Sequence, residues 1–180
     1  MIGDADFGVN ISSAFEKILS SLSQIHNPDI GSILSTAGRV FIFDIGSSIG
    51  GLIGQGFQAA GKQLQGKREL NAREFAAYLE IISKSIENAG GAKVGDKTLL
   101  DALYPAVTSA NEATRSGETS VKHTLEIAAL AAKQGAENTS NMVAKIGRAS
   151  YLGERSRGTI DAGAMFIYVF LNAMAKALDI

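Results

Sequence analysis

Apolar residues recur at the spacing of an α-helix along this chain, and that pattern limits the possible fold more than any other feature. Phe15, Ile18, Leu19 and Leu22 stand at positions i, i+3, i+4 and i+7, ahead of a helix-breaking Asn27–Pro28 pair. No long segment shows the alternation of apolar and polar residues that a half-buried strand requires. The pattern therefore predicts an all-α fold.

The clearest helix start is Asn71, an N-cap with Glu74 three residues later. This pair forms a capping box ahead of an apolar face at Phe75, Leu79 and Ile82. We expect further helices over 11–26, 96–115, 120–135 and 159–178, two within 32–67 that part near 46–51, and a shorter turn at 142–146. No repeat or linker interrupts them, so a single domain over 1–180 is expected.

Composition excludes several classes of protein. The 17 basic and 18 acidic side chains leave a net charge of −1, which gives no electrostatic footprint for nucleic acid or an anionic membrane. The absence of cysteine excludes disulfides and thiolate chemistry. The most apolar run, 162–178, is shorter than the roughly 20 residues of a membrane span, and no signal peptide follows Met1. We expect a soluble, cytoplasmic protein without a membrane span, in which any phosphate recognition is local.

The segment Gly147–Gly163 is polar and rich in glycine. It holds three arginines, two acids and four glycines. Glycine permits close backbone approach, and arginine meets phosphate with a planar fork of donors. The segment is therefore interpreted as an anion-binding loop, and the alternative is an ordinary surface loop between two helices.

A second polar cluster lies at the amino terminus. Asp4 and Asp6 stand one residue apart between glycines, ahead of the first helical pattern. Carboxylates so placed can hold a hard divalent cation, usually Mg²⁺ with nucleotide phosphates as further ligands. The alternative is a plain helix start.

Two glycine-rich stretches each allow two interpretations. Gly90–Thr98 lacks the Gly-Lys-Ser/Thr succession of a P-loop, which leaves either an anion site at a helix start or a plain helix capped by Asp96. Gly46, Gly50 and Gly54 are four residues apart. This spacing fits close packing of two helices, or a break where a nucleotide lies against the backbone.

Together these clusters resemble the nucleotide-binding L subunit, or domain, of dihydroxyacetone kinase. Residues 2–10 look like that family's metal loop, Gly-Asp-x-Asp-His-Gly-x-Asn. Residues 95–98, followed by Asp101 and Pro105, are similar to its middle motif, and residues 147–156 match its late motif almost letter for letter.

The resemblance implies a closed barrel of antiparallel amphipathic helices, here without the family's first helix. It implies that ATP or ADP binds at one end with Mg²⁺, and that a phosphoryl group passes to dihydroxyacetone on a separate K subunit. In some members a phosphotransferase-system M subunit rephosphorylates bound ADP. The phosphoryl-donor subunit is inactive without its K partner, and no catalytic residue is assigned.

Site residues carry over from the resemblance by motif. Asp4 and Asp6 are the expected metal ligands. The residues expected at the nucleotide are Phe7, Gly8, Val9, Asn10, Ser48, Ile49, Gly90, Leu99, Arg148, Asp161, Ala162 and Gly163.

Three departures from the family pattern affect the expected activity. A further metal aspartate of the family falls before Met1, Phe7 replaces a histidine, and Ile49 replaces a serine that touches the nucleotide. Fewer carboxylates weaken Mg²⁺ binding. The alternative function is a catalytically impaired homologue that acts as a regulatory or binding module. The related domain of fatty-acid kinases is a third, less favoured reading, because the chain ends at Ile180 without that group's additional domains.

Overall fold

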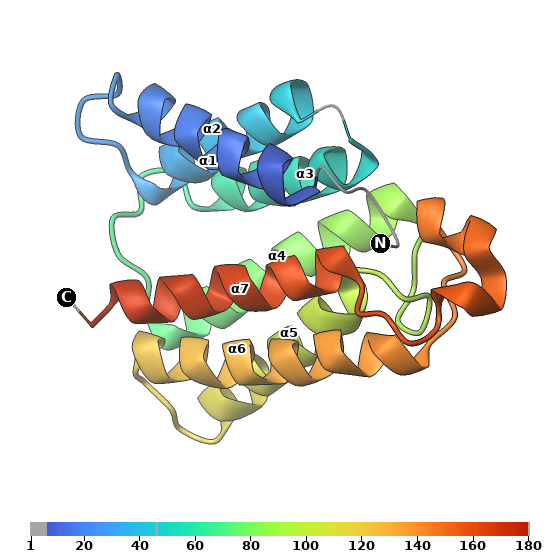
Figure 1. Ribbon diagram of the computed structural model, residues 1–180. Helices are drawn as coiled ribbons and strands as arrows, with labels where there is room; N and C mark the ends of the chain where they lie inside the picture. The colour runs from blue at the N-terminus through green and yellow to red at the C-terminus, as the bar shows by residue number, and fades with distance from the viewer. Residues whose placement is uncertain (1–6, 46, 180) are drawn as a thin grey trace.

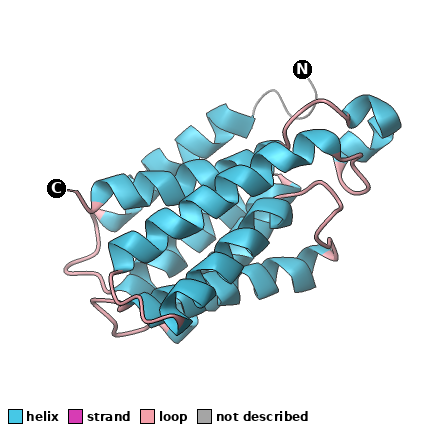
Figure 2. Ribbon diagram, turned by 90° about the horizontal axis from the view of Figure 1, so that it is seen from below, coloured by secondary structure: helices cyan, strands magenta, loops and turns pink. Residues whose placement is uncertain are grey.

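The computed structural model describes residues 7–45 and 47–179, and in these ranges every regular element is helical. Consecutive α-helices run in opposite directions and lie side by side (Figures 1 and 2). The all-α prediction is confirmed. The elements are α1 (Phe7–Leu22), α2 (Ile30–Asp44), α3 (Ser48–Gln63), α4 (Ala72–Gly90), α5 (Leu100–Arg115), α6 (Val121–Asn138), the 3₁₀-helices η1 (Thr139–Asn141) and η2 (Arg148–Ser156), and α7 (Ala162–Ala177).

Local sequence signals explain several helix ends. The Asn71 side chain accepts from the backbone N–H of Glu74 at 3.0 Å, and the Glu74 carboxylate accepts from the N–H of Asn71 at 3.0 Å. The predicted capping box is thus present at the start of α4. The predicted break between two helices within 32–67 is also present, since α2 ends at Asp44 and α3 begins at Ser48.

Several predicted helix ends, and one short predicted element, differ from the structure. α1 begins at Phe7 rather than at residue 11, because the Phe7 ring packs edge-on against Phe166 of α7 and extends the buried face of the helix. α5 begins at Leu100 rather than at Asp96. Residues 142–146 form no helical turn, and η1 comes directly before them.

Helices α2 and α3 pack with their backbones in contact. A Cβ atom added to Gly38 would lie 2.7 Å from the carbonyl oxygen of Gly54, and one added to Gly54 would lie 2.6 Å from that of Gly38. A Cβ on Gly50 would meet the Ile45 side chain at 2.7 Å. The packing interpretation therefore holds for Gly50 and Gly54, while Gly46 lies outside the described residues.

Aromatic side chains join the first and last helices across the interior. Phe15 of α1 lies 6.0 Å from Phe41 of α2 and 6.2 Å from Phe170 of α7, measured between ring centroids. Phe166 of α7 also packs on Phe41. A closed barrel requires such contacts between its ends, and closure itself stays a prediction.

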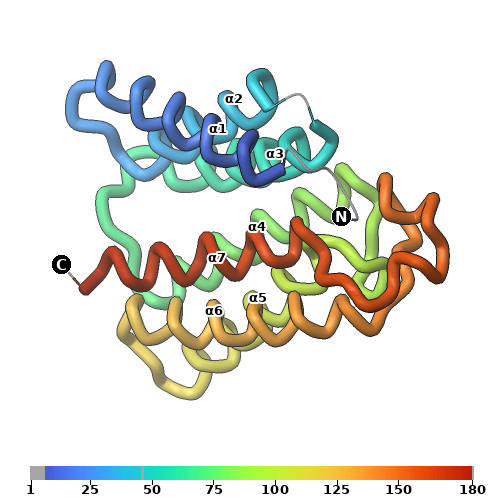
Figure 3. Tube along the Cα trace, viewed as in Figure 1, coloured from blue at the N-terminus to red at the C-terminus, as the bar shows by residue number. Residues whose placement is uncertain are grey.

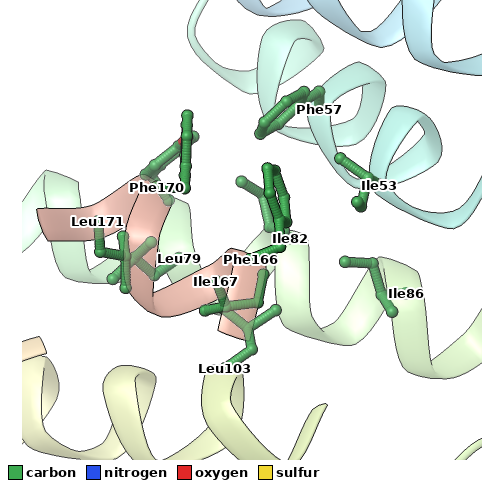
Figure 4. Close-up of a pocket in the computed structure, with 11 residues that line it drawn as sticks. Ile53, Phe57, Leu79, Ile82, Ile86, Leu103, Phe166, Ile167, Phe170 and Leu171 are labelled. Carbon is green, nitrogen blue, oxygen red and sulfur yellow. The ribbon is translucent and has the colours of Figure 1, made fainter. Parts of the chain in front are cut away.

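The apolar core leaves one small cavity among four helices. A cavity of about 20 Å³ lies among α3, α4, α5 and α7, with room for about one water molecule. Its walls are apolar, so it is expected to stay empty. Figure 4 labels ten of its eleven lining residues: Ile53, Phe57, Leu79, Ile82, Ile86, Leu103, Phe166, Ile167, Phe170 and Leu171.

Helix α7 is the most apolar segment of the bundle. It packs against α6 and α5, with Phe166 and Ile167 buried and Val169 about half exposed. Among the described residues, no helix combines the length and the apolar character that a bilayer crossing demands.

Candidate functional site

One end of the bundle holds a cavity of about 460 Å³, within the usual range of roughly 300–1,000 Å³ for small-molecule sites. Helices α3, α5 and α7 begin there, α4 ends there, and η2 borders it, so segments distant in sequence meet (Figure 3). The lining residues are Phe7, Ser47, Ser48, Ile49, Leu52, Ile86, Ala89, Gly90, Ala92, Lys97, Thr98, Leu99, Leu100, Ile146, Gly147, Arg148, Ala149, Thr159, Ile160, Asp161, Ala162 and Gly163.

Most of the residues that the resemblance assigns to the site line this cavity. The structure brings together Phe7, Ser48, Ile49, Gly90, Leu99, Arg148, Asp161, Ala162 and Gly163. They come from α1, α3, α4, η2, α7 and the turn before α5. Segments separated by more than a hundred residues therefore form one site.

The remaining predicted residues are placed differently. Gly8, Val9 and Asn10 form the first turn of α1 and do not line the cavity, and Val9 is 71% exposed. The expected loop at these residues is wrong, because the helix already includes them. Asp4 and Asp6 lie outside the described residues.

The starts of several helices face the cavity. The first turns of α1, α3 and α7 each supply lining residues, and so does the start of α5. The first N–H groups of a helix lack intrahelical acceptors and carry partial positive charge. Their convergence favours a bound anion.

Side-chain caps satisfy only some of these N–H groups. The Ser47 hydroxyl accepts from the N–H of Gly50 at 3.1 Å, at the start of α3. The Asp161 carboxylate accepts from the N–H of Ala164 at 2.8 Å, at the start of α7. Each capped helix keeps further first-turn donors that an anion can use.

Asp161 is a partly buried acid that lines the cavity. Desolvation raises the pKa of its carboxyl group, the hydrogen bond from Ala164 lowers it, and the nearby Asp101 carboxylate raises it further. The positive charge of Lys97 acts in the opposite direction. The primary contact of Asp161 is its cap on α7, which fixes the helix start that borders the cavity.

The turn between α4 and α5 differs from the predicted helix start. The Asp96 carboxylate accepts from the N–H of Lys93 at 2.8 Å and so closes a turn instead of capping a helix. The buried Asp101 carboxylate accepts from the N–H groups of Gly95 and Thr98, at 2.5 and 2.7 Å. Two acids thus shape this turn, and it presents residues 97–99 to the cavity.

The polar segment 147–163 is a folded border of the cavity. Gly147 and Gly153 adopt φ of +74° and +53°, which permits two sharp bends around η2. Arg148 opens η2 and lines the cavity, whereas Tyr151 is 89% exposed. The segment is thus both a surface loop and a wall of the cavity.

Sequence reasoning missed several lining residues. The most notable is Lys97, which is only 3% exposed. The Gly-Asp-Lys-Thr string at 95–98 was the available signal, but it was interpreted only as a glycine-rich helix start, and no role was assigned to Lys97. Ser47, Thr98 and Thr159 were also missed.

The described residues contain no group of three or more His, Cys, Asp or Glu side chains arranged to hold a metal ion. Among them, Asp161 is the carboxylate that lines the cavity.

The chain matches known proteins along nearly its whole length. A family model described as the DAK2 domain matches residues 1–176. The ADP-binding subunit DhaL of PEP-dependent dihydroxyacetone kinase from Escherichia coli (strain K12) is 35% identical over 176 residues, covering 98% of this chain and 83% of that subunit. The DhaL subunit of PEP-dependent dihydroxyacetone kinase 2 from Listeria innocua is 31% identical, with 98% and 82% covered.

Solved structures agree with these sequence matches. The native dihydroxyacetone kinase of C. freundii superposes with a TM-score of 0.72 at 26% identity, covering 97% of this chain and 29% of that one. The crystal structure of that kinase in complex with AMP-PNP and Mg²⁺ gives a TM-score of 0.68 at 28% identity, with 97% and 28% covered. With the family model spanning residues 1–176 and relatives above 30% identity covered over four fifths of their length, the chain belongs to the DAK2 domain family.

Proposed function

We propose that this chain is the nucleotide-binding, phosphoryl-donor subunit of a dihydroxyacetone kinase. It binds ADP or ATP with Mg²⁺ and passes a phosphoryl group to dihydroxyacetone held by a separate K subunit. We further propose that residues 1–180 form one domain and that the protein is cytoplasmic. The observation that carries the proposal is the convergence of nine motif residues on one cavity where helices begin.

The walls of the cavity divide into polar and apolar parts that suit a nucleotide. Ile49, Leu52, Ile86 and Leu99 offer apolar surface, which suits the planar base. Arg148 and the first turns of α3 and α7 offer positive charge and N–H donors, which suit the phosphates. Phosphoryl transfer depends on positioning and charge neutralisation more than on covalent chemistry by the protein.

Asp4 and Asp6 are the proposed metal ligands in this chain. Mg²⁺ bound between carboxylates and phosphate oxygens neutralises charge that builds up during transfer. The protein's own contribution is to hold the diphosphate against helix N-termini and Arg148. Gly8, Val9 and Asn10 can take part through the N–H groups of the first turn of α1.

The partner proposal follows from the names of the relatives. The E. coli and L. innocua proteins are described as ADP-binding subunits of PEP-dependent kinases. A K-type subunit that carries dihydroxyacetone is therefore the proposed acceptor partner. We also propose that a phosphotransferase-system M subunit rephosphorylates ADP that stays bound in this cavity.

Two apolar side chains favour a second candidate function, a catalytically impaired regulatory or binding module. Phe7 contacts Phe166 in the core, so it replaces a polar side chain at the metal loop with a packing residue. The Cδ1 atom of Ile49 would lie 2.8 Å from a Cβ on Gly163, so Ile49 fills the space beside the start of α7. Both substitutions reduce the polar contacts available to a nucleotide.

Calorimetric titration with ADP in the presence of Mg²⁺ tests the binding proposal. We expect saturable binding that weakens when Mg²⁺ is chelated. The absence of any heat signal at saturating Mg·ADP would remove the proposal.

Reconstitution separates the two candidate functions. The protein is mixed with a K subunit, dihydroxyacetone and ATP, or with a phosphotransferase M subunit and its donor in place of ATP. Formation of dihydroxyacetone phosphate supports the kinase subunit. A stable complex with the K subunit that gives no product supports the impaired module.

A further inference from the structure

The Lys97 side chain ends in a cage of backbone carbonyl groups. Its Nζ atom donates to the carbonyl oxygens of Thr139 at 2.8 Å, Met142 at 3.2 Å, Ser156 at 2.7 Å and Thr159 at 2.7 Å. All four acceptors belong to the single segment that runs from η1 to the start of α7. One ammonium group therefore ties η1 and Met142 to the later part of the polar segment 147–163.

The cage accounts for every donor of the ammonium group. An ammonium has three N–H bonds, and four carbonyl oxygens already surround it. A phosphate contact would require Lys97 to leave some of them. The side chain is thus bound to the protein rather than aimed at a ligand, unlike the lysine of a P-loop.

The four carbonyl groups share this cation. Two of them also have a second donor, since the Thr139 carbonyl accepts from the Met142 N–H at 3.1 Å and the Ser156 carbonyl accepts from the Thr159 hydroxyl at 2.9 Å. Without the ammonium, each of the four carbonyl oxygens would lose a charged donor, and the loss is costly because Thr139 and Ser156 are fully buried. Other hydrogen bonds also cross the segment: the Ala144 N–H donates to Ser156 Oγ at 2.9 Å, the Gly158 N–H to the Ser140 carbonyl at 2.7 Å and the Asp161 N–H to Thr139 Oγ1 at 2.8 Å. Lys97 differs from them in joining four points of the segment at one charged group.

The backbone of the turn is adapted to aim this side chain. Lys97 has φ of +61°, a conformation that non-glycine residues seldom adopt. The Asp101 carboxylate holds the turn from both sides, through Gly95 and Thr98. If this position only had to form the turn, glycine would adopt the positive φ without strain. The contacts of the lysine side chain therefore offset the backbone strain at Lys97.

We propose that Lys97 is a positioning residue: its ammonium group acts as a built-in cation that orders residues 139–161 and thereby places Arg148 and the start of α7 against the nucleotide. This inference rests on the proposed function for its readout of nucleotide affinity. Its other readout, the order of the segment, needs no ligand.

Two variants test the role. Lys97→Met keeps much of the length of the side chain but removes its charge and donors. Lys97→Gly suits the positive φ and empties the cage. Lys93→Met is the matched control, since it removes a positive charge from the exposed side of the same turn.

For both Lys97 variants we expect helical circular dichroism like that of the wild type, faster amide hydrogen exchange in 139–161, and Mg·ADP affinity lower by roughly 10- to 100-fold. The Lys93→Met control should match the wild type. Adding n-butylammonium to Lys97→Gly should restore slow exchange and affinity, because the ion refills the cage. Tetramethylammonium, which has no N–H donor, should not.

The outcomes are separable. A wild-type protein that fails to bind Mg·ADP rejects the proposed function, while exchange in 139–161 still tests the role of Lys97. Lys97 variants with unchanged exchange reject the inference, whatever their affinity. Loss of the whole helical signal in both variants also rejects it, because the lysine would then support the bundle rather than this segment.

Discussion

Replacing Gly135 with alanine tests how closely α6 approaches α5 beneath the cavity. Gly135 lies in α6, and a Cβ atom there would lie 2.2 Å from the carbonyl oxygen of Asp101 and 3.0 Å from the Cα of Ala102. Both obstacles are backbone atoms of α5. Ordinary contacts begin at 3.4 Å, so the two helices would have to separate by about 1 Å.

Two opposing terms set the size of the effect. Alanine is the better helix former by about 1 kcal/mol. Overpacking a close contact costs about 1–3 kcal/mol, and the upper end applies because a helix backbone cannot move aside as a side chain can. The net loss in the free energy of unfolding is therefore about 2 kcal/mol, which lowers Tm by roughly 4–8 °C for a chain of this length.

Gly51→Ala provides a matched control. Gly51 lies in α3, where a Cβ atom meets nothing within 4 Å. The same substitution should raise the free energy of unfolding by about 0.5–1 kcal/mol and Tm by roughly 1–4 °C. Thermal and urea unfolding followed by circular dichroism measure both variants. A Gly135→Ala protein as stable as the wild type would refute the close approach of α5 and α6.

Three further predictions concern the helix caps and the cavity. Hydrogen bonds from the side chain and backbone of Ser32 hold the pKa of Asp29 below its usual value, so this carboxylate stabilises the fold above about pH 4 and ceases to do so as pH falls through its folded-state pKa. Asp29→Asn should lower Tm at pH 7, and thermal scans should show the difference shrinking in acid. Arg148→Gln should weaken Mg·ADP binding by roughly 10- to 100-fold in calorimetry, whereas Arg155→Gln, on the exposed side of η2, should not. Ile49→Ser should strengthen binding by roughly 2- to 10-fold, and unchanged or weaker binding would count against a nucleotide beside that position.

The sequence predicted the helices better than it predicted their ends. Apolar spacing identified α1 and α4, because burial of one face sets the 3.6-residue period wherever a helix packs. The two helices within 32–67 were expected from an apolar stretch without strand-like alternation. The start of α5 was misplaced because an aspartate that accepts an N–H three residues away looks the same in a turn and at a helix N-cap. At Asp96 the acceptor faces backward, to Lys93, and no local pattern reveals that direction.

The site was predictable where motifs are contiguous and not where distant segments meet. Arg148 followed from the late motif at 147–156 and Gly163 from the family resemblance, and both line the cavity. The role of Lys97 was not predicted, because the carbonyl groups that accept its hydrogen bonds lie 42 to 62 residues further along the chain. A buried lysine and an exposed one carry the same letter, and only the fold shows which carbonyl groups surround it.

Asp101 links two features of the structure: the close approach of α5 to α6 at Gly135, and the carbonyl cage around Lys97. The backbone of Asp101 touches α6, and its carboxylate holds the turn that aims Lys97. Separation of α5 from α6 would move this carboxylate, and with it the turn and the segment that carries Arg148. Gly135→Ala should therefore weaken Mg·ADP binding even at temperatures where the bundle stays folded, and Gly51→Ala has no such route through Asp101. Tight helix packing at this end of the bundle thus serves the geometry of the cavity as well as stability.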